Sequence, residues 1–165
     1  MLLIFALILP LNGAHAQNEN TEIGVATSSQ ATYTFPATFS GNLTFDASQA
    51  VSNSKTYQLG VLSTFQLTSM SSVFKIAATM TIHFTAKNWN NAWFIRPILG
   101  WERDTVGVVL TSGVVYGIQI GKRFAIADQL IFKPTVEFSR NVANNAQVIL
   151  TPLSLSYFIS VPQLF

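Results

Sequence analysis

The sequence predicts an all-β fold, an antiparallel up-and-down β-barrel of about eight strands that crosses a membrane. Apolar or small residues alternate with polar ones along most of the chain. In residues 33–45, for example, every odd position is apolar or small, and the even positions are Thr, Pro, Ser or Asn. A period of two residues gives a strand one apolar and one polar face. Only 10% of the residues are charged, whereas 49% are hydrophobic, so the polar face suits an enclosed wet interior better than bulk water. The body of the chain has no run of about 20 apolar residues, so strands rather than helices are expected to span the membrane.

Polar turns separate the runs of alternating residues. We expect strands at residues 21–29, 31–45, 56–67, 73–86, 92–101, 106–123, 129–141 and 147–165. The first turn, near Ser28, decides the count, because a single strand over 21–45 would leave seven strands and put the termini on opposite sides. An even number puts both termini on one side, which is the periplasmic side in bacterial barrels.

The first 16 residues have the features of a secretory signal peptide. Leu2 to Leu11 forms a short apolar core, and Ala14-His15-Ala16 is a small-x-small cleavage site. We therefore expect two parts, a signal at 1–16 and a barrel domain at 17–165, with cleavage after Ala16. The alternative for residues 1–16 is a short buried or membrane-anchoring helix.

Charged residues within the expected strands share the parity of the polar face. Lys75, Arg96, Lys133 and Glu137, together with His83, all fall opposite the apolar frame of their strands. We predict a lumenal charge network of Lys75, Arg96, Lys133 and Glu137, with Arg96 as a plausible partner of Glu137, because enclosed charges are costly unless they are paired or hydrated. The alternative is that water solvates each charge separately.

Aromatic residues lie near the ends of several runs. Membrane barrels place aromatic girdles at both interfaces. The residues expected there are Tyr57, Trp93, Trp101, Tyr116 and Tyr157.

Residue types that carry catalysis or bind metals are scarce. His83 is the one histidine of the expected mature chain, and its position in the sequence links it to no serine or carboxylate as a catalytic triad would require. The chain has no cysteine and no cluster of His or carboxylate residues, so neither a metal nor a cofactor is expected. The net charge of +2 is too small to indicate a nucleic-acid partner.

The chain resembles the small, eight-stranded outer-membrane β-barrel proteins of Gram-negative bacteria. The resemblance is carried by the signal with Ala14-His15-Ala16, by the alternating runs, and by the last strand, which ends at Phe165. Residues Tyr157, Ile159, Val161 and Phe165 look like the C-terminal signal read by the barrel-assembly machinery. The resemblance implies location in the cell outer membrane, with outer-membrane lipids and that machinery as partners.

Three functions remain open from the sequence. The first is a non-enzymatic outer-membrane barrel with a structural, adhesive or narrow-channel role. The second is a barrel enzyme that modifies lipid A or phospholipid with His83 as its base. The third is a secreted soluble β-barrel or sandwich that binds an apolar ligand. An eight-stranded interior is about filled by side chains, which favours a structural role over bulk solute flow.

Overall fold

A computed structural model describes residues 21–32, 38–51, 56–67, 71–84 and 91–159. The expected signal peptide at 1–16 lies outside these residues, as do Val161 and Phe165 of the expected assembly signal. The strands are β1 (Thr21–Thr32), β2 (Thr38–Ala50), β3 (Tyr57–Leu67), β4 (Ser71–His83), β5 (Trp93–Val106), β6 (Val109–Lys122), β7 (Phe124–Ala125), β8 (Leu130–Phe132), β9 (Thr135–Arg140) and β10 (Ala146–Ile159). No helix in this part of the chain is long and apolar enough to cross a membrane.

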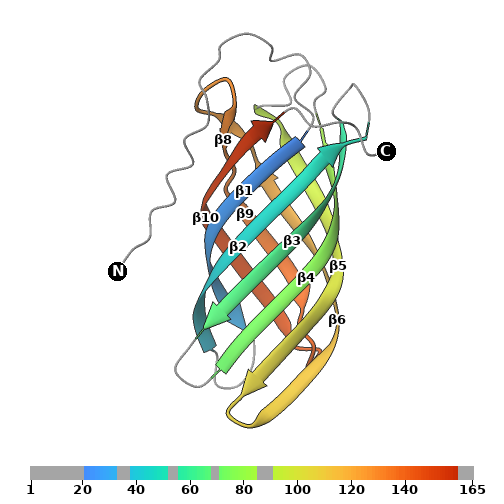
Figure 1. Cartoon of the computed structure of the whole chain (residues 1–165), viewed down its shortest axis with the longest axis vertical. Coiled ribbons are helices and arrows are strands. Elements are labelled where there is room, and N and C mark those ends of the chain that lie inside the picture. Colours follow the sequence, from blue (N-terminus) through green and yellow to red (C-terminus); the bar gives the residue numbers. More distant parts are fainter. Residues whose placement is uncertain (1–20, 33–37, 52–55, 68–70, 85–90, 160–165) are drawn as a thin grey trace.

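The strands form one closed antiparallel barrel (Figure 1). Strands β1 to β6 follow one another around the wall, β6 pairs with β9, β9 pairs with β10, and β10 closes the barrel by pairing with β1. Short β8 pairs with β10 beyond β9, so β8 and β9 occupy one position in the wall, interrupted at Lys133 and Pro134. With β7 as a short extension beside β8, the wall has the eight positions that the alternation predicts.

Two predicted turns lie where the structure has a continuous strand, and the loop predicted to begin at Asp46 begins too early, because β2 continues to Ala50. The first turn does not lie near Ser28, because β1 continues to Thr32 and pairs with β2 along its whole length. The predicted turn at 102–105 is also wrong, because β5 continues to Val106 and the chain reverses at Gly107 and Val108. The two misplaced turns have one cause. A run of polar residues usually marks a turn in a soluble protein, whereas in this barrel polar residues also line the interior or continue a strand beyond the apolar band.

The β5–β6 connection is a two-residue hairpin. Val106 pairs with Val109, and Gly107 between them has a φ of 58°. In a tight hairpin of this kind, the first turn residue needs a positive φ, which glycine adopts without steric cost. In Figure 1 this hairpin reaches lowest, at the end of the barrel opposite the start of β1 and the end of β10. We call that end the hairpin end, and the end where Thr21 pairs with Ile159 the termini end.

The wall has an apolar outer surface. Exposed large apolar side chains occur on nearly every strand, and on β5 they run from Trp93 through Leu99 to Trp101. These nine positions match the roughly 9–11 residues that a tilted strand needs to cross a bilayer. Beyond Trp101 the outward positions become polar at Arg103 and Thr105, which indicates the edge of the apolar band.

Candidate functional site

The interior of the barrel is polar and charged. Alternation within each strand turns every second side chain inward, and the inward positions are occupied mainly by Ser, Thr, Asn, Gln and ionisable residues. The buried ionisable residues are Glu22, Asp46, Lys75, His83, Arg96, Glu102, Arg123, Lys133 and Glu137.

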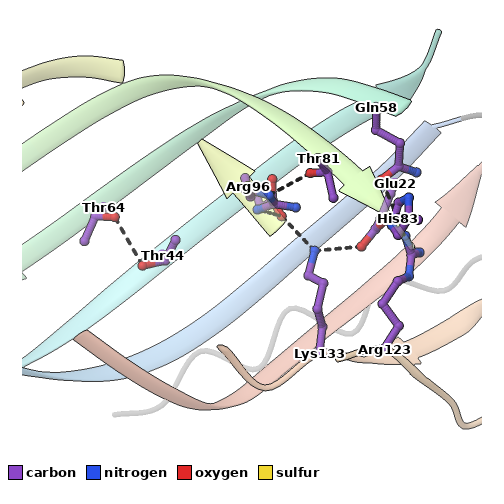
Figure 2. Close-up of polar contacts among 10 residues, drawn as sticks. Glu22, Thr44, Gln58, Thr64, Thr81, His83, Arg96, Arg123 and Lys133 are labelled. Atoms are coloured by element: carbon purple, nitrogen blue, oxygen red, sulfur yellow. Dashed lines mark hydrogen bonds and ion pairs between the residues drawn. The ribbon is translucent and has the colours of Figure 1, made fainter. Parts of the chain in front are cut away.

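Five of these residues form a continuous chain of ion pairs across the lumen (Figure 2). Arg123 Nη2 lies 2.8 Å from Glu22 Oε2, and Lys133 Nζ lies 2.7 Å from Glu22 Oε1. The same amine is 2.8 Å from Asp46 Oδ2, which also accepts a 2.8 Å hydrogen bond from Arg96 Nη1. Lys133 therefore bridges two carboxylates, and each carboxylate also contacts an arginine. We call these five residues the lumen chain.

A separate ion pair lies beside the lumen chain. Lys75 Nζ donates a 2.8 Å hydrogen bond to Glu137 Oε1, and both side chains are about 95% buried. Both residues also line an interior cavity of about 20 Å³, together with Arg96 and Lys133. A cavity of this volume holds about one water molecule. Around these two residues the lumen is therefore filled mainly by side chains.

The ion pairs join strands that are not neighbours in the wall. Arg96 on β5 and Asp46 on β2 are separated by β3 and β4, and Lys75 on β4 and Glu137 on β9 are separated by β5 and β6. Each pair thus crosses the lumen and connects opposite sides of the barrel. Additional hydrogen bonds hold the charged groups, such as the one from Arg96 Nε to Thr81 Oγ1 at 2.7 Å.

The structure places all four residues of the predicted charge network inside the lumen, with different partners. Glu137 pairs with Lys75 and not with Arg96. Gln119 of β6 pairs with both Arg96 and Glu137 and separates them in the wall, while Arg96 Nη1 donates across the lumen to Asp46.

Three members of the lumen chain were missed by sequence reasoning. Asp46 falls in a predicted loop although β2 continues to Ala50, and Glu22 lies in the weakly patterned first strand. Arg123 follows the last residue of β6. Parity is the signal that finds them, because each occupies the position opposite the apolar frame of its segment.

His83 lies at the termini end of the lumen, where it ends β4 and is 2% exposed. Its Nε2 atom is 2.7 Å from Arg123 Nη1 (Figure 2). A guanidinium has no acceptor, so this geometry requires His83 Nε2 to be the accepting nitrogen. The lone pair that a general base would use is therefore directed at an arginine.

The aromatic residues predicted at the membrane interfaces face outward or lie partly exposed. Tyr57 and Trp93 begin β3 and β5 at the termini end, and Tyr157 lies near the end of β10 at the same end. Trp101 and Tyr116 lie further towards the hairpin end. Ile159, which shares the expected assembly signal with Tyr157, is the last residue of β10.

The described residues contain no group of three or more His, Cys, Asp or Glu side chains that could hold a metal ion. The charged groups that do gather in the lumen are engaged with one another.

The fold is that of small outer-membrane β-barrels. No protein-family model matches the chain, and no curated protein matches its sequence. Among solved structures, Neisserial surface protein A aligns with a TM-score of 0.72 at 12% identity, covering 90% of this chain and 100% of that one. The attachment invasion locus protein Ail of Yersinia pestis, in complex with the heparin analogue sucrose octasulfate, aligns with a TM-score of 0.60 at 6% identity, covering 86% of this chain and 98% of that one. The N-terminal β-barrel domain of Pseudomonas aeruginosa OprF aligns with a TM-score of 0.60 at 7% identity, covering 87% and 100%.

Proposed function

We propose that this protein is an integral outer-membrane protein with a structural, non-enzymatic role, and that its lumen is closed by ion pairs. One observation carries the proposal: a closed barrel has an apolar outer wall and an interior in which opposite sides are tied together by charges. Exposed apolar side chains over most of the wall would be unfavourable in water and suit a hydrocarbon environment. Barrel closure satisfies the backbone hydrogen bonds that lipid cannot.

Because the number of strands is even, both ends of the barrel wall lie on the same side of the membrane. Both described ends of the barrel wall, Thr21 and Ile159, lie at the termini end, which we assign to the periplasm. The hairpin end then faces the outside of the cell, with short connections such as Gly107–Val108 and 141–145. Such connections offer little surface for a large ligand-binding crown, which supports a structural role.

Cell fractionation with gel migration tests this placement. We expect the full chain in the outer-membrane fraction, where it migrates faster in unheated than in heated samples because the folded barrel resists detergent. Recovery of the folded chain in the aqueous fraction without detergent would instead support a secreted soluble β-barrel that binds an apolar ligand.

An enzymatic role is disfavoured by the state of His83. Its accepting nitrogen contacts Arg123, and it lies among buried residues that include Gln58, whose Oε1 accepts a hydrogen bond from the same guanidinium at 3.4 Å. Mass spectrometry of lipid A and phospholipids tests this directly. We expect the same lipid profile from cells carrying His83→Ala as from cells carrying the unaltered chain, and a changed profile would support a lipid-modifying enzyme.

Attachment is a second candidate, favoured by the tip of the β5–β6 hairpin. Val106, Val108, Val109 and Leu110 are all more than half exposed, beyond the polar positions Arg103 and Thr105 of β5. A Val108→Asp variant tests this role in a cell-adhesion assay. Reduced adhesion at unchanged barrel folding would support attachment, whereas unchanged adhesion would leave the structural role as the better account.

A further inference from the structure

We infer that the outer wall carries a site for one anionic phospholipid, with an acyl chain along β9 and a phosphate at Lys122. The inference rests on the proposed membrane placement and adds a specific lipid to it. Its starting point is an open groove of about 740 Å³ on the outside of the barrel, where β6, β9 and β10 meet near the termini end.

The groove results from small or short side chains between large ones. Val136 of β9 points outward between its partners Ile120 of β6 and Leu150 of β10. In the next row towards the termini end, Pro134 and Pro152 line the groove. Larger rings, including Phe138 and Trp93, border these residues and leave a hollow over β9.

Backbone irregularities deepen the hollow at the same place. Pro134 interrupts the wall position shared by β8 and β9, and the pairing of β1 with β10 shifts register opposite Thr151 and Pro152. A proline supplies no N–H to a ladder, and a bulge bends the strand that contains it. The depression is therefore built into the wall and is independent of any one side-chain rotamer.

The lining of the groove is almost entirely apolar, which suits a hydrocarbon chain. Its volume is within the usual range of small-molecule sites. Thr135 and Thr151 also border it, but both side chains belong to the buried, inward set. A polar solute would therefore find few groups to bind, whereas an acyl chain needs none.

A single cation stands at the rim. Lys122 ends β6, and its amine lies 4.9 Å from the ring centroid of Phe124 and 5.6 Å from that of Trp93. Among the described residues its side chain takes part in no ion pair with a carboxylate. A tryptophan at this position marks the headgroup level. Lys122 thus presents a positive charge where a phosphate would lie if the acyl chain followed the groove.

The cation at the far end of the same seam differs in its contacts. Arg140 Nη1 donates hydrogen bonds to the backbone oxygen and the side-chain oxygen of Asn144, at 3.0 and 3.3 Å. Its guanidinium is thereby tied to the 141–145 loop. The smaller groove beside Arg140, of about 420 Å³, is therefore bordered by a guanidinium that is tied to a loop, whereas the larger groove at the termini end has the amine of Lys122 at its rim.

Native mass spectrometry of the full chain released from detergent tests the site, with titrations of palmitoyl-oleoyl phosphatidylglycerol and, separately, the matching phosphatidylcholine. We expect one phosphatidylglycerol per barrel, bound several-fold more tightly than phosphatidylcholine. Lys122→Gln should weaken phosphatidylglycerol binding about fivefold, as expected for one interfacial charge, and weaken phosphatidylcholine binding less, because the choline ammonium offsets the charge of its phosphate. Arg103→Gln removes an outward cation at the hairpin end and should not change the binding of either lipid.

A second pair of variants tests the groove itself. Val136→Phe fills the hollow while retaining Lys122 and should abolish retention of both lipids. Val61→Phe, the same change at an exposed wall position on β3, should retain them. Heat-modifiable migration verifies that each variant folds. Three results would each overturn the lipid site: equal binding of the two lipids, equal effects of Lys122→Gln and Arg103→Gln, or a dimer that Val136→Phe dissociates. None of them would contradict the proposed membrane placement.

Discussion

Glu137→Gln isolates one cross-lumen ion pair with the smallest change of shape. Glutamine has nearly the same volume as glutamate, so the variant removes a charge without creating a cavity. Lys75 would then remain buried without its carboxylate. We expect the barrel to lose stability because the amine loses its bonded carboxylate, and Glu102, its cross-strand neighbour, already accepts a hydrogen bond from the Val142 amide.

The magnitude follows from the geometry. At a separation of 2.8 Å and an effective dielectric constant of about 20, the attraction between the two charges is about 6 kcal/mol. Breaking a buried pair by removing one partner typically costs about 3–5 kcal/mol. The neighbouring cavity can hold about one water molecule that would partly solvate Lys75, so we expect the lower end of the range, about 3 kcal/mol.

Urea unfolding in phospholipid vesicles, followed by tryptophan fluorescence, measures the change. The double variant Lys75→Met/Glu137→Gln removes both charges and should be more stable than Glu137→Gln alone, because no unpaired charge is left. A loss below about 1 kcal/mol for Glu137→Gln, or a double variant that is no more stable than Glu137→Gln, would contradict a stabilising ion pair between Lys75 and Glu137.

Three further changes test other parts of the account by the same unfolding measurement. Lys133→Met should cost at least about 3 kcal/mol because it removes a charge shared by Glu22 and Asp46, whereas Lys122→Met on the outer wall should cost little; equal losses would contradict the lumen chain. Gly100→Ala should cost about 1–3 kcal/mol because a Cβ there would collide with the carbonyl oxygen of Ile76 and with Ala77, whereas Gly41→Ala meets no atom within 4 Å; a neutral Gly100→Ala would show that the wall yields at this point. Gly107→Val should cost about 1–3 kcal/mol because of the positive φ, with Val108→Ala as the control, and equal stability of both variants would argue against the tight hairpin.

The wall of the barrel is predictable from the sequence because its signal is local. Each strand repeats its period of two within a few residues, so the parity of Lys75, Arg96, Lys133 and Glu137 follows without knowledge of their partners. Turns are less predictable. The polar run Glu102–Thr105 has the composition of a loop, yet in the structure it continues β5 beyond the apolar band.

The partners inside the lumen are not predictable in the same way. Lys133 contacts Glu22 and Asp46, which are 111 and 87 residues away in the chain. These contacts depend on how wide the barrel is and how its strands are staggered, which are properties of the closed sheet. The groove over Val136 is likewise invisible in the sequence, because it arises from three strands and two prolines that meet only after closure.

Conductance across a planar lipid bilayer tests the central claim, that ion pairs and side chains close the lumen of a membrane barrel. The refolded full chain should insert without producing current steps, while a wide bacterial porin in the same bilayer serves as the positive control. Stable single-channel steps from the purified, folded chain would contradict a sealed lumen and show that ions pass between the residues of the lumen chain.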